Sequence, residues 1–105
     1  MQASIRRYIV SAGHEPEAIK HAQEGWIEIL QAVPGFVAYY FVDTGDGEML
    51  GVSVFDSPDG ARRANELARD YVNAHLSQIL HRTIILEGTV VAHAHRDEPG
   101  ITGSP

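Results

Sequence analysis

Residues 34–57 read PGFVAYYFVDTGDGEMLGVSVFDS and hold two apolar runs separated by the turn sequence GDG. An Asp-Gly pair between apolar runs is a strong hairpin signal, so we expect strands at residues 36–43 and 48–55. Neither run alternates between apolar and polar residues, as a strand with one face in water would. Both faces of this hairpin are therefore expected to be covered.

The flanking sequence adds one strand and one helix on each side of the hairpin. Residues 4–10 and the Ile- and Val-rich residues 84–93 are typical of strands. Apolar residues recur with a helical period from Pro16 to Val33. A second helix is predicted to begin near Ser57 and Pro58, a capping residue followed by a proline in the first turn, and to continue to Ile79.

The order βαββαβ predicts an α+β, ferredoxin-like fold. Right-handed crossovers place both helices on one face of a four-stranded antiparallel sheet. Residues 1–95 are expected to form this single domain. Residues 96–105, a polar stretch with Gly and Pro, are expected to be a disordered C-terminal tail.

The other face of the sheet is left without a covering element from the same chain. If Asp46 and Gly47 are the two turn residues, Tyr39, Phe41 and Val52 lie together on that face. Soluble monomers rarely expose so much contiguous apolar surface. We therefore expect a homodimer that packs the two sheets across a two-fold axis. A three-residue turn would shift the pairing by one residue and mix the two sets of side chains.

The helix-covered face is expected to carry Tyr40 and Phe55 beside the small residues Ala38, Gly51 and Ser53. The small residues leave room for a pocket between the sheet and the helices. The alternative is that the small residues only let the helices approach the sheet closely and fill that space.

Composition excludes several classes of function. The formal net charge is −6, and the Arg6-Arg7 and Arg62-Arg63 pairs are isolated and expected on the surface, so no nucleic-acid partner is expected. The absence of cysteine excludes disulfides and thiolate nucleophiles. No apolar run approaches the roughly 20 residues that span a membrane. The N-terminal residues lack the apolar region of a signal peptide, so a cytoplasmic protein is expected.

The PGF sequence at 34–36, the hairpin, and the VFDS sequence at 54–57 that leads into the second helix resemble the dimeric α/β-barrel superfamily. The resemblance is closest to the antibiotic-biosynthesis-monooxygenase-like group and extends over about residues 4–93. It implies a two-fold dimer with a pocket between sheet and helices in each subunit. The activities it implies are cofactor-independent oxidation of quinol-like aromatics by dioxygen, and haem degradation.

The chain departs from the haem-degrading members of that group. Those members place an Asn on the first strand and a Trp with a His on the second helix. Here the second helix carries His75 without a Trp, and the first strand has no Asn. A quinol-type reaction without a cofactor is therefore expected in preference to haem degradation.

Candidate site residues follow from the predicted helix and strand faces. His75 shares a helical stripe with Leu67 and Tyr71, so it is a candidate general base or substrate-orienting group. A structural histidine near the helix C-terminus is the alternative. Tyr40 is the second candidate catalytic residue, against a Tyr that only fills the core. The residues expected to line the ligand site are Trp26, Phe55, Tyr71 and Asn65.

His93 and His95 place two imidazoles on one strand face, but a third ligand is missing, so no metal is expected. Three hypotheses for function remain. The first is a dimeric monooxygenase-like enzyme that acts on a small aromatic or quinone-like molecule. The second is a non-catalytic dimeric module that binds a small ligand or serves in a stress response. The third is a structural dimer with a filled core.

Overall fold

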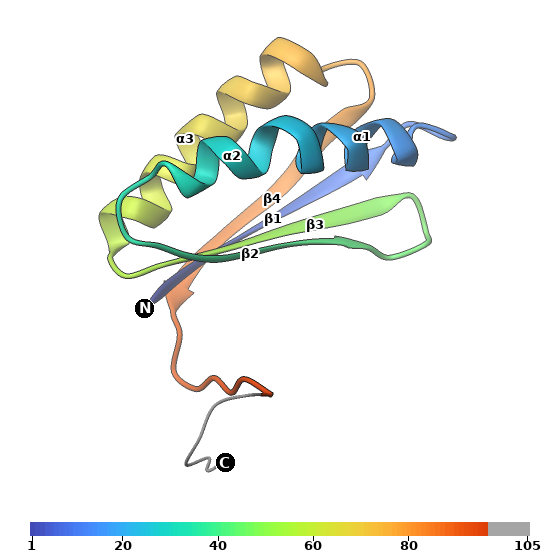
Figure 1. The fold of residues 1–105 in the computed structure, drawn as a ribbon. Coiled ribbons are helices and arrows are strands. Elements are labelled where there is room, and N and C mark those ends of the chain that lie inside the picture. Colours follow the sequence, from blue (N-terminus) through green and yellow to red (C-terminus); the bar gives the residue numbers. More distant parts are fainter. Residues whose placement is uncertain (97–105) are drawn as a thin grey trace.

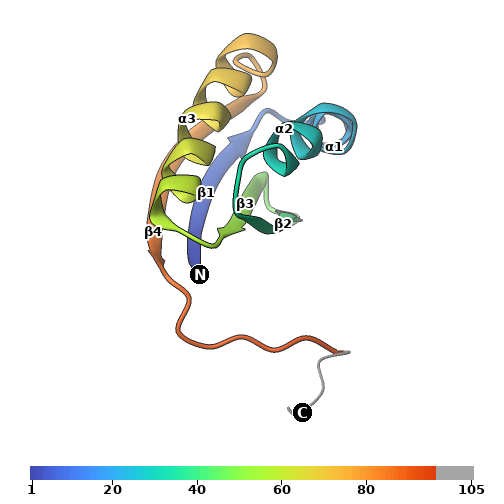
Figure 2. The same ribbon diagram turned by 60° about the vertical axis from the view of Figure 1, so that its left-hand side comes forward.

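The computed structural model describes residues 1–96, and its elements follow the predicted order (Figure 1). They are β1 (Gln2–Val10), α1 (Glu15–His21), η1 (Ala22–Trp26), α2 (Ile27–Gln31), β2 (Phe36–Asp43), β3 (Glu48–Phe55), α3 (Pro58–His75) and β4 (Leu80–Thr89). The strands form one antiparallel sheet in the order β2-β3-β1-β4, and the helices lie on one face (Figure 2). The predicted α+β, ferredoxin-like βαββαβ fold is confirmed.

The expected tail begins at Arg96, and residues 97–105 lie outside the described part of the chain. None of the helices within residues 1–96 is long and apolar enough to cross a membrane.

The first helical segment runs through α1, η1 and α2. Its buried side chains fall at every fourth position: Ala18, Ala22, Trp26 and Leu30. Four residues of α-helix turn through about 400°, so such a stripe would drift by about 40° at each step. The π-helical turn η1 is wider and offsets this drift. Trp26 therefore stays turned toward the sheet.

Helix α3 lies close against β3 because its inner face is small. Ala61, Ala64 and Ala68 are buried there. The Ser57 hydroxyl accepts a hydrogen bond from the Gly60 backbone N–H at 3.4 Å, as expected for the cap of a helix that begins at Pro58. A Cβ added at Gly60 would lie 2.8 Å from Cδ1 of Phe55, so only glycine permits this approach.

The hairpin register differs by one residue from the expected one. Tyr40 pairs with Val52, and Phe41 pairs with Gly51. The loop spans four residues, 44–47, and is closed by a hydrogen bond from the Thr44 backbone N–H to the Glu48 carbonyl at 3.1 Å. This is the pairing given by the alternative three-residue turn, and the two-residue turn considered at Asp46 and Gly47 is absent.

This shift reverses the side chains of β2, because neighbouring residues on a strand point to opposite faces. Tyr39 and Phe41 pack against the core under the helices, so their predicted place on the open face is wrong. Tyr40 and Val42 take that place beside Val52, which lies there as predicted. A bulge between Phe36 and Ala38 returns Phe36 to the helix-covered face.

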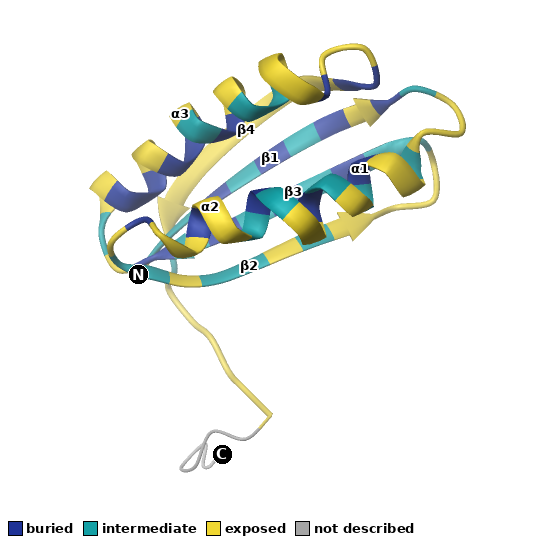
Figure 3. Cartoon of the chain, turned by 45° about the horizontal axis from the view of Figure 1, so that its top comes forward, coloured by how far each residue is buried: buried dark blue, intermediate teal, exposed yellow. Residues whose placement is uncertain are grey.

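The open face of the sheet is apolar across all four strands. One row of paired residues consists of Leu86, Ile5, Val52 and Tyr40. Tyr40 and Leu86 are 57% and 55% exposed, and β4 is exposed over most of its length (Figure 3). No element within residues 1–96 covers this face (Figures 1 and 2).

The next row consists of Ile84, Arg7, Leu50 and Val42. Arg7 forms an ion pair with Glu48, and its hydrogen bond holds the pKa of that carboxyl below the ordinary value. The single charge in the middle of this row is therefore neutralised within the chain.

Strand β4 spans Leu80–Thr89, whereas residues 84–93 were predicted. It pairs with β1 from Val10↔Leu80 to Gln2↔Thr89. The last strand thus ends opposite Gln2, the first residue of β1. Side-chain hydrophobicity alone does not predict this limit.

Candidate functional site

A small cavity lies between the sheet and the helices. Its volume is about 30 Å³, enough for water but not for an aromatic ring. Its walls come from β1, β2, α1, η1 and α3, from the loop after α3, and from the first residue of β4. The lining residues are Arg6, Tyr8, Ala18, Ala22, Trp26, Tyr39, Phe41, Ala68, Tyr71, Val72, Leu76 and Leu80. At this size the cavity fits the alternative in which the helices approach the sheet closely and fill most of the space between them.

Aromatic rings form much of the wall. The ring centre of Trp26 lies 5.7 Å from that of Tyr71 and 6.5 Å from that of Tyr39. Tyr39 in turn stacks on Phe41, with ring centres 6.4 Å apart. Flat apolar surfaces of this kind bind planar aromatic molecules well.

Arg6 is the charged group of the cavity and is only 1% exposed. Its terminal nitrogens donate to three neutral side chains: to Ser53 at 2.8 Å, to the Asn65 carbonyl at 3.0 Å and to Ser4 at 3.3 Å. Its Cζ lies 5.8 Å from the centre of the Trp26 ring. The expected surface position of Arg6 is therefore wrong.

Strand alternation predicts that Arg6 and Arg7 point to opposite faces of the sheet, but not which of the two faces the helices cover. Ser4, Arg6, Tyr8 and Val10 are all buried on the helix-covered face, while Ile9 is exposed. The Arg-Arg pair straddles the two faces of β1.

Tyr39 lies in the wall of the cavity, the position that was expected for Tyr40. Burial raises the pKa of Tyr39 far above its ordinary value, and the charge of Arg6 opposes this only partly. The hydroxyl therefore stays protonated at neutral pH and can donate a hydrogen bond.

Tyr71 closes one side of the cavity. Its hydroxyl lies 3.0 Å from Nδ1 of His21. A Cβ added at Gly25 would lie 2.6 Å from this hydroxyl oxygen, so the glycine makes room for it. Beyond Tyr71 is a surface depression of about 450 Å³ whose lining includes His21 and Glu24. Tyr71 thus separates the buried cavity from this larger open space.

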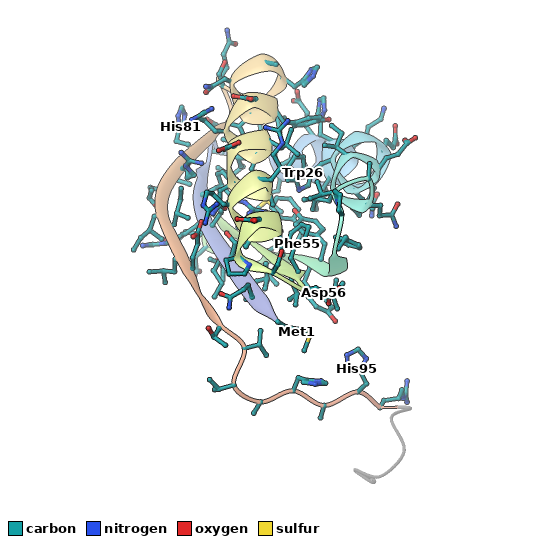
Figure 4. The ribbon with its side chains drawn as sticks, turned by 90° about the vertical axis from the view of Figure 1, so that its left-hand side faces the viewer. Met1, Trp26, Phe55, Asp56, His81 and His95 are labelled. Atoms are coloured by element: carbon teal, nitrogen blue, oxygen red, sulfur yellow. The ribbon has the colours of Figure 1, made fainter. Side chains whose placement is uncertain are left out.

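The residues expected to line a ligand site differ in where they lie relative to the cavity. Trp26 and Tyr71 line the cavity, whereas Phe55 is fully buried beside Phe36, with ring centres 5.8 Å apart, and is outside the lining. Figure 4 shows Trp26 and Phe55 between helices and sheet, with His81 and His95 outside. Sequence reasoning missed His21, which has no motif around it.

His75 is exposed and does not line the cavity, so its expected orientation toward the sheet is wrong. Its ring centre lies 4.6 Å from that of Tyr71 and 5.9 Å from that of His21. Tyr40 lies on the opposite face of the sheet and cannot reach the cavity. Both residues were mispositioned by reasoning from local spacing alone.

Asn65 lies beside the cavity and contacts Arg6 directly. Its carbonyl oxygen accepts hydrogen bonds from Arg6 and from the Ser4 hydroxyl, and its amide donates to Glu87. These bonds occupy both ends of the amide, so Asn65 holds Arg6 in place and is not free to face a ligand.

The described residues contain no group of three or more His, Cys, Asp or Glu side chains arranged to hold a metal ion. The rings of His93 and His95 lie beyond β4, with centres 6.1 Å apart.

No protein family profile matches the chain, and no curated protein does. Solved structures share its fold. A monooxygenase from the ActVA-Orf6 gene of Streptomyces coelicolor, in complex with nanaomycin D, is 14% identical with a TM-score of 0.69, over 91% of this chain and 92% of that one. SnoaB, a cofactor-independent oxygenase from Streptomyces nogalater, is 20% identical with a TM-score of 0.63, over 92% and 97%.

A variant of MhuD with two manganese protoporphyrin IX molecules bound per active site is 19% identical, with a TM-score of 0.67 over 90% of this chain and 99% of that one. At these identities the likeness establishes the fold and leaves the activity open. The chain therefore has the same ferredoxin-like fold as these solved structures.

Proposed function

We propose that this chain binds a small planar aromatic molecule between its sheet and helices and oxidises it with dioxygen, without a resident cofactor. The observation that carries the proposal is the aromatic-walled cavity built around the buried guanidinium of Arg6. The structural neighbours include a cofactor-independent oxygenase, SnoaB, which shares this fold.

Ligand entry requires Tyr71 to turn outward. The cavity of about 30 Å³ is far smaller than the roughly 300 Å³ of a typical small-molecule site. Tyr71 lines both this cavity and the depression of about 450 Å³, so a turn of its side chain would join the two spaces. Tyr71 is suited to this movement because it is half-buried and lies at the seam between α1 and α3.

The simplest reaction of this class converts a phenol and dioxygen into a quinone and water. One oxygen atom becomes the new carbonyl on the ring carbon opposite the phenol oxygen. The hydrogens of that carbon and of the hydroxyl leave in the water. Because the phenolate gives up electrons more readily than the phenol, the protein must take a proton and then exclude water.

The groups of the cavity suit those tasks. Tyr39 and Arg6 are the donors available to the phenol oxygen. His21 lies at the mouth and takes the proton directly or through the Tyr71 hydroxyl, which it contacts at 3.0 Å. Trp26 and Phe41 supply the apolar walls.

Oxygen uptake with a panel of naphthols and hydroquinones tests this proposal. We expect consumption of one dioxygen for each quinone formed from a naphthol. His21→Ala should lower kcat about 100-fold or more, as for loss of a general base. His75→Ala is the matched control, because that imidazole is exposed beside the same tyrosine, and it should retain full activity. If the wild-type protein turns over no member of the panel, the result would contradict the proposal.

The second candidate function is a binding module without catalysis. It is favoured by one observation: Arg6 and the tyrosines are the only ionisable side chains that line the cavity in the described chain, and none of them is a ready base. Saturable binding of a naphthol with no oxygen uptake would select this alternative.

We further propose that two copies of the chain assemble through their open sheet faces. The apolar rows of Leu86, Val52 and Tyr40, and of Ile84 and Val42, supply a contact surface. Burying each of these side chains is worth roughly 1.5–3 kcal/mol, which offsets the cost of association.

A further inference from the structure

Arg6 is a buried cation without a charged partner. Its three hydrogen-bond acceptors are neutral oxygens of Ser4, Ser53 and Asn65. Among the residues that the structure describes, no carboxylate forms an ion pair with it, and its Nε is a buried donor without an acceptor. A guanidinium does not lose its proton in a protein, so its burial remains costly until an anion arrives.

One carboxylate is connected to Arg6 indirectly, through hydrogen bonds to Asn65, which lies between them. Glu87 accepts a hydrogen bond from the Asn65 amide, and Asn65 in turn faces Arg6 with its carbonyl oxygen. Glu87 is exposed on β4, so water screens most of its charge. This relay orients Asn65 and leaves Nε of Arg6 unsatisfied.

Glycine at position 51 keeps a space open beside this donor. A Cβ added at Gly51 would lie 3.5 Å from one terminal nitrogen of Arg6, 3.8 Å from its Nε and 3.6 Å from the Tyr39 hydroxyl. These are ordinary contact distances, so the space holds about one methyl group. Arg6 and Tyr39, which both line the cavity, therefore border this space from two sides, and each also contacts the ring of Trp26.

We infer that the ligand of this cavity is an aromatic oxyanion whose charged oxygen binds Nε of Arg6 and the Tyr39 hydroxyl while its ring lies against Trp26. The inference rests on the proposed function, since it names the class of ligand for the same cavity. A phenolate and an aromatic carboxylate share this chemistry. A neutral aromatic of the same shape leaves the guanidinium unpaired and binds more weakly.

Two pairs of probes distinguish charge from shape. The first is 1-naphthoate against the neutral 1-naphthamide. The second is 4-nitro-1-naphthol, whose visible spectrum distinguishes phenol from phenolate, against its methyl ether. In calorimetric titrations of the full chain, the dissociation constant of the anion should be about tenfold or more lower than that of its neutral counterpart. The pair with the larger ratio identifies the type of oxyanion, and nitronaphthol should be bound as the phenolate.

Two variants complete the test. Arg6→Gln should abolish the preference for the anion while retaining weak binding of the neutral probe. Gly51→Ala keeps the charge but fills the space beside it, so it should weaken both anions about tenfold or more relative to wild type. Gly88→Ala is its control, because a Cβ there meets nothing within 4 Å, and it should bind as wild type does. If Arg6→Gln does not fold, the wild-type ratios and Gly51→Ala decide.

The outcomes separate this inference from the proposed function. Equal binding of anion and neutral probe overturns the inference and leaves an aromatic site in place. Absence of binding by all four probes overturns both. An anion preference that survives Gly51→Ala unchanged places the anion elsewhere and also overturns the inference.

Discussion

At the scale of single residues, the account depends on the cost of burying Arg6 without an anion. The three neutral acceptors around it replace water only in part, and one donor stays unpaired. Such an arrangement is tolerated in proteins when a ligand makes use of it, and it lowers the stability of the ligand-free state.

Replacement of Arg6 by an apolar side chain should therefore cost the empty protein little stability. For Arg6→Met we expect a free energy of unfolding within about 3 kcal/mol of wild type, because removal of the desolvated charge offsets the hydrogen bonds that Ser53 and Asn65 lose. Urea denaturation measures this, with the exposed Arg62→Met as the control. A loss of more than about 3 kcal/mol would show that Arg6 mainly holds the fold together.

Individual residues also show the limits of sequence reasoning. Trp26 and Tyr71 were predicted to line the cavity and do so, because helical period reports the inward face of a helix. Arg6 was expected on the surface, since an isolated arginine is usually exposed. No local sequence feature predicts that Arg6 will form hydrogen bonds with Ser53 and Asn65, which are distant in sequence.

At the scale of secondary-structure elements, loop geometry decided which face of β2 each side chain occupies. Both runs of the hairpin are apolar, so periodicity could not choose between two registers one residue apart. The four-residue loop uses positive φ at Gly45 and Gly47, of 86° and 80°, and a hydrogen bond from the Gly45 N–H to the Asp43 side chain. These interactions depend on how the loop closes in three dimensions, which the sequence pattern does not specify. As a result, Tyr39 and Tyr40 lie on the opposite faces from those that were expected.

Element packing yields a second prediction, at the first turn of α3. Gly60→Ala should lower the free energy of unfolding by about 1–3 kcal/mol, because the new methyl group meets Cδ1 of Phe55 at 2.8 Å and its ring carbon Cγ at 3.0 Å. The better helix propensity of alanine offsets about 1 kcal/mol at most. Urea midpoints would measure the change, with the open position Gly88→Ala as the control. An unchanged midpoint for Gly60→Ala would contradict the close packing of α3 on β3.

At the scale of the whole molecule, the sequence predicted the order and sides of the elements. Helix periods, the Ser57 cap and the Asp-Gly turn are local features, and they were sufficient for the ferredoxin-like fold. The prediction that one sheet face lacks a cover within the chain also holds for residues 1–96. The residues on that face could not be predicted without the strand register. The cavity volume could not be predicted without the packing of α1 against α3.

The open face leads to a prediction about assembly. Light scattering of the wild-type protein at micromolar concentration should give about twice the chain mass of 11.5 kDa. Val42→Glu adds a charge to the β2 side of the proposed interface and should yield the monomer, because a desolvated carboxylate without a partner is costly. Gln23→Glu adds the same charge at an exposed helical position and should remain dimeric. A monomeric wild-type protein would refute the proposed assembly.

The central claim is that a planar ligand enters between the sheet and the helices. Trp26 is the only tryptophan of the chain, so its indole N–H gives a single, assignable NMR signal in that layer. Titration with 1-naphthoate should shift this signal saturably, while the backbone amides of Tyr40 and Leu86 on the open face stay in place. A Trp26 signal that does not move up to the solubility limit of the ligand, or shifts confined to the open face, would contradict the account.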